Sequence, residues 1–250
     1  MSTEPEAAPI VDSVGAKERR RTLGRALGVA AAVTAAVTVA SARLPDSLVA
    51  TVVGSIFLAA TWILVWRNDD ALVERSGLAL GGLVLPGEFD TTRLARSVGI
   101  ALGWALAAAA VTFVPFYFGF RFFWHPRVPF SLHITPWDFA KEVAGQILII
   151  ALPEEAFYRG YLQSRLDDAF PARVRIFGAN VGPAIVVTSV IFAIGHFATI
   201  REPARLAVFF PSLLFGWLRA RTKGVGAGVA FHAACNVYSE LLGRGFRLYL

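Results

Sequence analysis

The stretch GQILIIALPEEAFYRGY, residues 145–161, contains the feature that decides how this chain folds. It begins as an apolar run of the kind that suits lipid, yet it places Glu154, Glu155 and Arg159 within the same run. An ionised side chain near the centre of a bilayer costs on the order of 2.5–3.5 kcal/mol, so such residues face the interior of a helix bundle and usually serve a function there. The stretch therefore predicts a membrane-crossing helix with a polar, protected face.

The composition of the whole chain agrees with a membrane protein. Of its 250 residues, 56% are hydrophobic and only 17% are charged, a balance that soluble domains seldom reach. Apolar runs of about 20 residues, enough to cross roughly 30 Å of hydrocarbon, recur along the chain. They predict an all-α, polytopic bundle of about seven transmembrane helices around a polar cavity, at residues 26–42, 48–66, 98–120, 143–162, 181–199, 204–219 and 224–243.

The basic residues indicate topology rather than a nucleic-acid partner. The net charge is +6, but no soluble basic domain is present to bind phosphates. Most of the 24 Lys and Arg residues fall in alternate connections between the helices, beginning with KERRR at residues 17–21. This bias predicts a cytoplasmic N-terminus. We expect an integral protein of a bacterial inner (plasma) membrane, with membrane lipid as a partner. The sequence does not determine the oligomeric state.

Composition divides the chain into parts of different character. The first part is rich in Ala, Pro and acidic residues, which predicts a disordered cytoplasmic tail. The basic and then apolar stretch that ends in ASA at residues 40–42 is either a retained helix or a cleaved signal. The predicted parts are a tail at 1–16, N-terminal helices and loops at 17–139, a core with the polar residues at 140–243 and a short tail at 244–250.

The carboxylates of the opening stretch differ in their helical neighbours. Glu155 and Arg159 are four residues apart on one helix face, so they can pair and offset part of each other's desolvation. Glu154 points about 100° away and lacks that partner, which suits a general base. Pro153 removes a backbone donor and can open room for water beside the carboxylate. The alternative interpretation is a salt-bridge cluster that only packs helices, or charges that snorkel from a helix end.

Two further predicted helices each confine their polar residues to one turn. The first contains FAIGH, in which Phe192 precedes His196, and Gly195 allows a neighbouring helix to approach closely. The second contains HAACN, in which His232 and Asn236 share a face and could hold a developing oxyanion. Each also has a purely structural interpretation, a hydrogen-bonded core histidine in the first helix and an interhelical hydrogen-bond pair in the second.

Taken together, the three helices supply two carboxylates, an arginine, two histidines and an amide. This set includes a base, a proton shuttle and oxyanion donors, which are the groups that peptide hydrolysis needs. The same groups would also suit a proton-coupled membrane transporter. A third alternative is a non-catalytic immunity or scaffold protein that keeps the bundle.

The ordered motifs E-E-x-x-x-R (Glu154, Glu155, Arg159), F-x-x-x-H (Phe192, His196) and H-x-x-x-N (His232, Asn236) resemble those of a known family. This is the CPBP family of CAAX protease and bacteriocin-processing (Abi) intramembrane proteases, related to type II CAAX prenyl endopeptidases. The resemblance covers about residues 140–240.

The resemblance implies an endopeptidase whose catalytic core, residues 140–243, encloses a cavity open to one side and to lipid. By that resemblance, Glu154 and His196 activate the attacking water, and His232 and Asn236 stabilise the oxyanion. The resemblance also implies a supporting role, without contact with the substrate, for Glu155, Arg159 and Phe192. The implied substrate is a membrane-associated or lipid-modified protein, or a peptide precursor, cut near its C-terminus.

A metal cofactor is the alternative that the resemblance leaves open, because family members have been labelled metalloproteases. If a metal is present, Glu154, His196 and His232 would make a plausible Zn²⁺ ligand set. The chain has no H-E-x-x-H arrangement, and a His/Asn pair four residues apart suits an oxyanion better than a metal. We therefore expect a glutamate-activated water and no cofactor.

Overall fold

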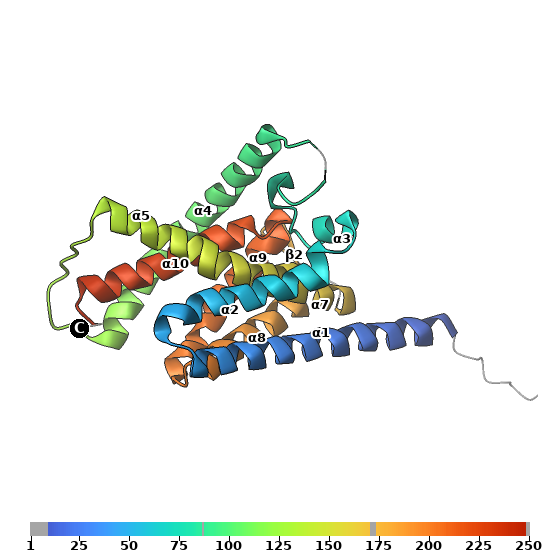
Figure 1. Ribbon diagram of the computed structural model, residues 1–250, viewed down its shortest axis with the longest axis horizontal. Helices are drawn as coiled ribbons and strands as arrows, with labels where there is room; N and C mark the ends of the chain where they lie inside the picture. Colours follow the sequence, from blue (N-terminus) through green and yellow to red (C-terminus); the bar gives the residue numbers. More distant parts are fainter. Residues whose placement is uncertain (1–9, 87, 171–173, 249–250) are drawn as a thin grey trace, which may run out of the picture.

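The structure is a computed structural model that describes residues 10–86, 88–170 and 174–248. Throughout these residues the chain is almost wholly helical, and its long helices lie side by side in one bundle (Figure 1). The predicted all-α membrane-type bundle is confirmed. Three helices are long and apolar enough to cross a membrane, at Gly15–Arg43, Asp46–Trp66 and Thr91–Trp124, and Pro183–Thr199 is a shorter apolar helix. The count of seven spans stays a prediction.

The N-terminal half consists of three long helical segments joined by short ones. Its elements are α1 (Ile10–Arg43), α2 (Asp46–Thr61), the π-helix η1 (Trp62–Trp66), α3 (Asp70–Arg75), the 3₁₀ helix η2 (Leu80–Gly82) and α4 (Thr91–Trp124). Two aspartates set the starts of helices, because each accepts hydrogen bonds from backbone N–H groups that lack a partner in the first turn. Asp69 caps α3 in this way, and Asp90 caps α4.

The second half is built around a helical rod that changes winding along its length. The rod comprises α5 (Pro136–Gly145), the π-helix η3 (Gln146–Ala151), α6 (Leu152–Glu155), the π-helix η4 (Ala156–Gln163) and α7 (Ser164–Ala169). A two-stranded antiparallel hairpin follows, β1 (Val174–Ile176) and β2 (Ala179–Val181). The chain continues through α8 (Pro183–Thr199), the 3₁₀ helix η5 (Pro203–Val208), α9 (Phe209–Thr222) and α10 (Gly226–Gly245).

The predicted division of the chain into tails and core stays a prediction. The structure describes α1 from Ile10, within the tail predicted at residues 1–16, and no proline interrupts the chain from there to Arg43. Residues 1–9 lie outside the described residues. At the other end, α10 continues to Gly245, and Phe246 packs in a small apolar cluster with Phe120 and Leu242. Residues 249–250 of the predicted C-terminal tail also lie outside the described part.

The core of the bundle surrounds the central rod. Phe157 and Leu162 of η4 are wholly buried, as are Phe215 and Leu218 of α9 to within a few per cent. Close approach depends on Gly54 of α2, where an added Cβ would overlap the backbone carbonyl oxygen of Ile149 in the rod.

The outer surface of α4 shows what surrounds the bundle. Its large apolar side chains are mostly exposed, with 75% of Val111 and 79% of Phe122 uncovered. In water such a surface would be an aggregation hazard, whereas in a bilayer it faces lipid. The polar residues of the sequence motifs lie inside the bundle, away from this apolar surface.

Candidate active site

The two adjacent glutamates lie on different faces of the central rod, because consecutive residues of a helix point about 100° apart. A single α-helical turn, Leu152–Glu155, is flanked by the π-helices η3 and η4. Such π-helical turns are frequent at functional sites. Pro153 contributes to the irregular winding, because it has no N–H to donate to the carbonyl of Ile149 four residues earlier. Gly54 of α2 packs against that same carbonyl.

Glu155 belongs to a wholly buried ion pair. Its Oε1 accepts a hydrogen bond from Nη1 of Arg159 at 2.8 Å, and both side chains are 0% exposed. The guanidinium also donates to the hydroxyl and carbonyl oxygens of Ser212 on α9, and it lies over the rings of Phe192 and Phe215. Buried charges persist when they are paired and hydrogen-bonded in this way. The pairing predicted from the four-residue spacing is confirmed.

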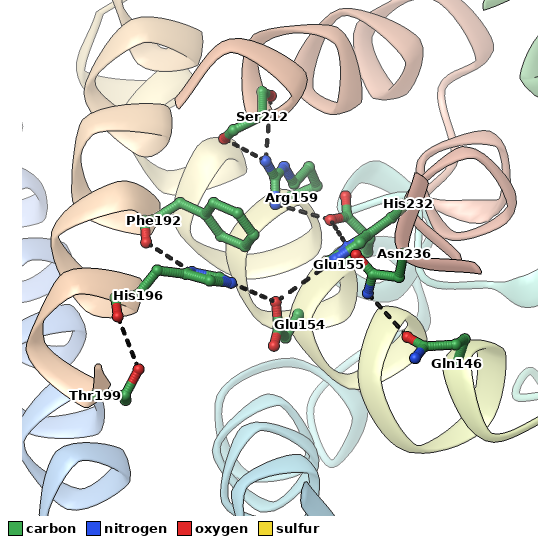
Figure 2. A network of polar contacts seen from close by, with 10 residues as sticks. All are labelled: Gln146, Glu154, Glu155, Arg159, Phe192, His196, Thr199, Ser212, His232 and Asn236. Atoms are coloured by element: carbon green, nitrogen blue, oxygen red, sulfur yellow. Dashed lines mark hydrogen bonds and ion pairs between the residues drawn. The ribbon is translucent and has the colours of Figure 1, made fainter. Parts of the chain in front are cut away.

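His232 of α10 is held between the two glutamates (Figure 2). Its Nδ1 lies 2.9 Å from Oε1 of Glu155. Because the ion-paired carboxylate can only accept, Nδ1 carries the proton. The other nitrogen, Nε2, lies 3.9 Å from Oε2 of Glu154. Phe215 stacks on the imidazole with ring centroids 4.7 Å apart and so fixes the plane of the ring.

His196 of α8 approaches Glu154 from the opposite side. Its Nδ1 lies 3.0 Å from the backbone carbonyl of Phe192, which again can only accept. Nε2 is therefore turned toward the glutamate, 4.0 Å from Oε2. The close helix contact predicted at Gly195 is also present, since an added Cβ there would lie 3.0 Å from the hydroxyl of Tyr158 on η4.

Asn236, the fourth predicted residue, is one turn beyond His232 and has a different partner. Its Nδ2 donates to Oε1 of Gln146 at 2.9 Å, and among the described residues that is its one side-chain hydrogen bond. Figure 2 shows its side chain beside His232, on the same side of the site as Glu155. The three motifs therefore converge on one place, with Glu154 at the centre and Asn236 at its edge.

The charges of this cluster balance only if it holds one additional proton. Glu154 and Glu155 contribute two negative charges against the single positive charge of Arg159. A buried net charge is costly, so the neutral form of the cluster holds one additional proton. His232 presents one ring nitrogen to each carboxylate.

A metal ion fits the described side chains poorly. Zn²⁺ ligands lie about 2.0–2.2 Å from the ion, so neighbouring ligand atoms in a tetrahedral site are roughly 3.3 Å apart. The two imidazole nitrogens are 3.9 Å and 4.0 Å from the Glu154 oxygen. Within the described ranges, no group of three or more His, Cys, Asp or Glu side chains has metal-holding geometry. The absence of a cofactor stays a prediction.

Two residues of the site were missed by the sequence reasoning. Ser212 holds Arg159 from α9, and Gln146 holds Asn236 from the start of η3. Gln146 did carry a signal, since it is a lone amide in the apolar run GQILII. Ser212 carried none, because an isolated serine in an apolar helix is common and costs little.

The fold and these groups together describe a membrane-embedded helix bundle with the side chains that a hydrolase uses. Residues 136–238 match the family model described as "Type II CAAX prenyl endopeptidase Rce1-like". The match includes all three motifs and confirms the predicted resemblance over this region. It indicates an integral membrane protein and a protease of the CAAX type. Comparisons with curated proteins and with solved structures gave no match.

Proposed function

We propose that this protein is an intramembrane endopeptidase that cuts a membrane-associated or lipid-modified protein, or a peptide precursor, near its C-terminus. The observation that carries the proposal is the position of Oε2 of Glu154 between two imidazole Nε2 atoms, 3.9 Å and 4.0 Å away. Polar atoms at such separations can share a bridging water. Glu154 Oε2 is buried and has no hydrogen-bond partner among the described residues, so it is available to that water.

In the proposed reaction Glu154 acts as the general base. It takes a proton from the water while the water oxygen attacks the carbonyl carbon of the substrate peptide. His196 supports this step, because its bond to the Phe192 carbonyl leaves Nε2 turned toward the same water. The proton then passes to the leaving amine as the carbon–nitrogen bond breaks.

The oxyanion formed in this step would be stabilised from α10. Protonated His232 keeps its Nδ1–H on Glu155 and presents Nε2–H to the side of the site where Glu154 lies. Asn236 supplies a second donor, since its amide nitrogen has one N–H beyond the one given to Gln146. Fixed donors in a site that excludes water act strongly on a developing negative charge.

The location of the site limits the substrate. Backbone in a regular helix is shielded by its own hydrogen bonds, so the cut segment must enter extended or unwound. The apolar surface of the bundle favours a tail that is itself apolar or lipidated and arrives from the bilayer. The membrane that we propose is a bacterial inner (plasma) membrane, and the distribution of Lys and Arg favours a cytoplasmic N-terminus.

Cleavage of quenched-fluorescent peptides with free C-termini, by purified protein in detergent, tests the proposal. We expect Glu154→Gln and His196→Ala to lower kcat by about 10²–10⁴-fold, the usual contribution of a general base. Glu202→Gln, at an exposed glutamate in the connection after α8, is the matched control and should cleave like wild type. Wild-type protein that cleaves no peptide, while Glu154→Gln abolishes proton-driven uptake into vesicles, would establish the transport alternative instead.

The contribution of a metal is tested with the same assay. We expect cleavage to persist after dialysis against phenanthroline or EDTA and removal of bound metal, checked by elemental analysis. Loss of activity that Zn²⁺ restores would show that Glu154, His196 and His232 bind a catalytic ion.

A further inference from the structure

A chain of hydrogen bonds leads from the candidate oxyanion donor to the rim of the bundle. Asn236 donates through Nδ2 to Oε1 of Gln146 at 2.9 Å, and Gln146 donates through Nε2 to Oε1 of Glu142 at 3.1 Å. Glu142 accepts in turn from Nη2 of Arg244 at 3.0 Å, and Arg244 also donates to Glu240. We call Glu142, Gln146 and Asn236 the amide relay. Figure 2 shows its inner bond, from Asn236 to Gln146.

The direction of the amide relay is set by its outer member. Glu142 is ion-paired with Arg244 and can therefore only accept hydrogen bonds. Gln146 must turn its NH₂ group toward that carboxylate, which leaves its carbonyl oxygen facing Asn236. Asn236 must then turn its own NH₂ group toward Gln146. A side-chain amide has two possible orientations, and the relay selects one of them.

We infer that Gln146 is a positioning residue that fixes the orientation of the Asn236 amide, with Glu142 fixing Gln146. This inference rests on the proposed function, because Asn236 matters in this way only if it meets an oxyanion. Gln146 itself would touch neither the water nor the cut bond. Its effect would be to hold one N–H of Asn236 so that the other keeps a constant direction.

The surroundings of the relay agree with a polar rather than a packing role. Gln146 is half-buried, and a pocket of about 480 Å³ lies against it and Glu142. That pocket is also lined by Lys141 and Arg244. Gln146 is therefore not needed to fill a tight apolar core, and an apolar residue of the same length could take its place. Its hydrogen bonds are the feature that such a replacement would remove.

The decisive variants separate the acceptor on residue 146 from its volume. Gln146→Met keeps the length but removes the acceptor, so we expect kcat to fall about 10–100-fold with KM nearly unchanged. Gln146→Glu keeps an acceptor for Asn236 but places two carboxylates together. Its activity relative to wild type should be low at pH 8 and should rise as the pH falls, because the two carboxylates can then share a proton.

The double variant Glu142→Gln with Gln146→Glu reverses the relay's partners. The amide now at position 142 donates to the carboxylate now at position 146, which still accepts from Asn236. We therefore expect kcat to recover to within about threefold of wild type without the added pH dependence. Glu142→Gln with Gln146→Met lacks the acceptor and should stay impaired. The matched control is Gln163→Met, at a buried glutamine of the same rod that donates to the Gly216 carbonyl. This variant should have a lower melting temperature and a kcat close to that of wild type.

The outcomes distinguish the relay from the function on which it rests. If wild type cleaves, Glu154→Gln does not, and Gln146→Met cleaves at the wild-type rate, the relay is wrong and the protease stands. Equal losses in Gln146→Met and in the double variant with Gln146→Glu would also overturn it, because a packing role predicts that result. If Glu154→Gln cleaves like wild type, the proposed function itself fails.

Discussion

Glu155 has more hydrogen-bond partners than the neighbouring Glu154. Its Oε1 accepts from both Arg159 and His232, while its Oε2 is turned toward the backbone of α10 at Gly228. In both glutamates Oε2 lacks a hydrogen-bond partner among the described residues, but Glu155 also has an Oε1 that is held at 2.8 Å by Arg159 and at 2.9 Å by His232. The adjacent carboxylates thus differ in kind. One holds the structure of the site, and the other is free to react.

This difference predicts that substitutions at the two neighbouring glutamates change the free energy of unfolding by very different amounts. Glu155→Ala leaves the wholly buried guanidinium of Arg159 without its counter-charge, so we expect the free energy of unfolding to fall by about 3–5 kcal/mol. Glu154→Gln should change it by less than about 1 kcal/mol, because no hydrogen bond of the carboxylate is lost. Thermal unfolding in a single detergent measures both. Equal destabilisation by the two variants would contradict the division of roles.

Two aspartates outside the predicted span at 143–162 should make the stability of the fold respond to pH in opposite directions. Burial raises the pKa of Asp167 in α7 to about 6, against the attraction of Arg219. The folded state then binds a proton more readily than the unfolded state, so stability falls as the pH rises from about 4 to about 6. Hydrogen bonds from Lys141 and Thr135 lower the pKa of Asp138 at the start of α5. Its contribution to stability is present above an ordinary carboxyl pKa and is lost as the pH falls below it.

Melting temperatures of two Asp→Asn variants check these signs. Asp167→Asn should raise the melting temperature at pH 8 and change it little at pH 4, where the native carboxyl is protonated. Asp138→Asn serves as the matched comparison and should lower it slightly at pH 8, since its partners are exposed. Shifts of the same sign in both variants would show that burial does not control Asp167.

At the scale of elements, the site depends on how closely α10 lies against the central rod. An added Cβ at Gly228 would lie 2.9 Å from Oε2 of Glu155, which is too close for the carboxylate to keep its place. The glycine therefore allows Glu155 to reach His232 and Arg159 together. A helix usually gains about 1 kcal/mol when Gly becomes Ala, so any loss here must come from this contact.

Gly228→Ala tests the contact, with Gly103→Ala as the matched control. Gly103 lies in α4 with nothing within 4 Å of an added Cβ. We expect Gly103→Ala to keep full cleavage activity and wild-type or slightly higher stability. Gly228→Ala should lower both kcat and the melting temperature, because it displaces the residue that holds His232. Unchanged activity in Gly228→Ala would mean that Glu155 can move without cost to the site.

The elements also show which features a single sequence could reveal. The apolar runs predicted the long helices, and the four-residue spacing predicted the Glu155–Arg159 pair, because both follow from helical periodicity. The π-helical winding on either side of α6 was not predicted, since an apolar run that indicates a helix does not specify how the helix is wound. The hydrogen bond that Asn236 donates to Gln146 joins residues 90 positions apart. No local pattern indicates which of many distant side chains will meet.

At the scale of the whole molecule, the bundle has one end that is much more basic than the other. The start of α1, the connection between α2 and α4, and the connection after α9 lie toward one end of the bundle in Figure 1. Together with the helix turns beside them, these segments contain half of the chain's 24 Lys and Arg residues. The loop between α4 and α5 lies at the opposite end. The fold thus gathers charges that are scattered along the sequence, and positive charge favours the cytoplasmic side.

This asymmetry predicts which end labels from outside the cell. The chain has a single cysteine, Cys235, so a Cys235→Ala background leaves only an introduced thiol. In bacterial cells that express the protein, a membrane-impermeant maleimide should label Arg127→Cys, in the α4–α5 loop, before lysis. Lys17→Cys, near the start of α1, should label only after the membrane is opened, since both native side chains are exposed and access alone distinguishes them. Labelling of Lys17→Cys in intact cells, with Arg127→Cys protected until lysis, would reverse the orientation and place the basic end outside.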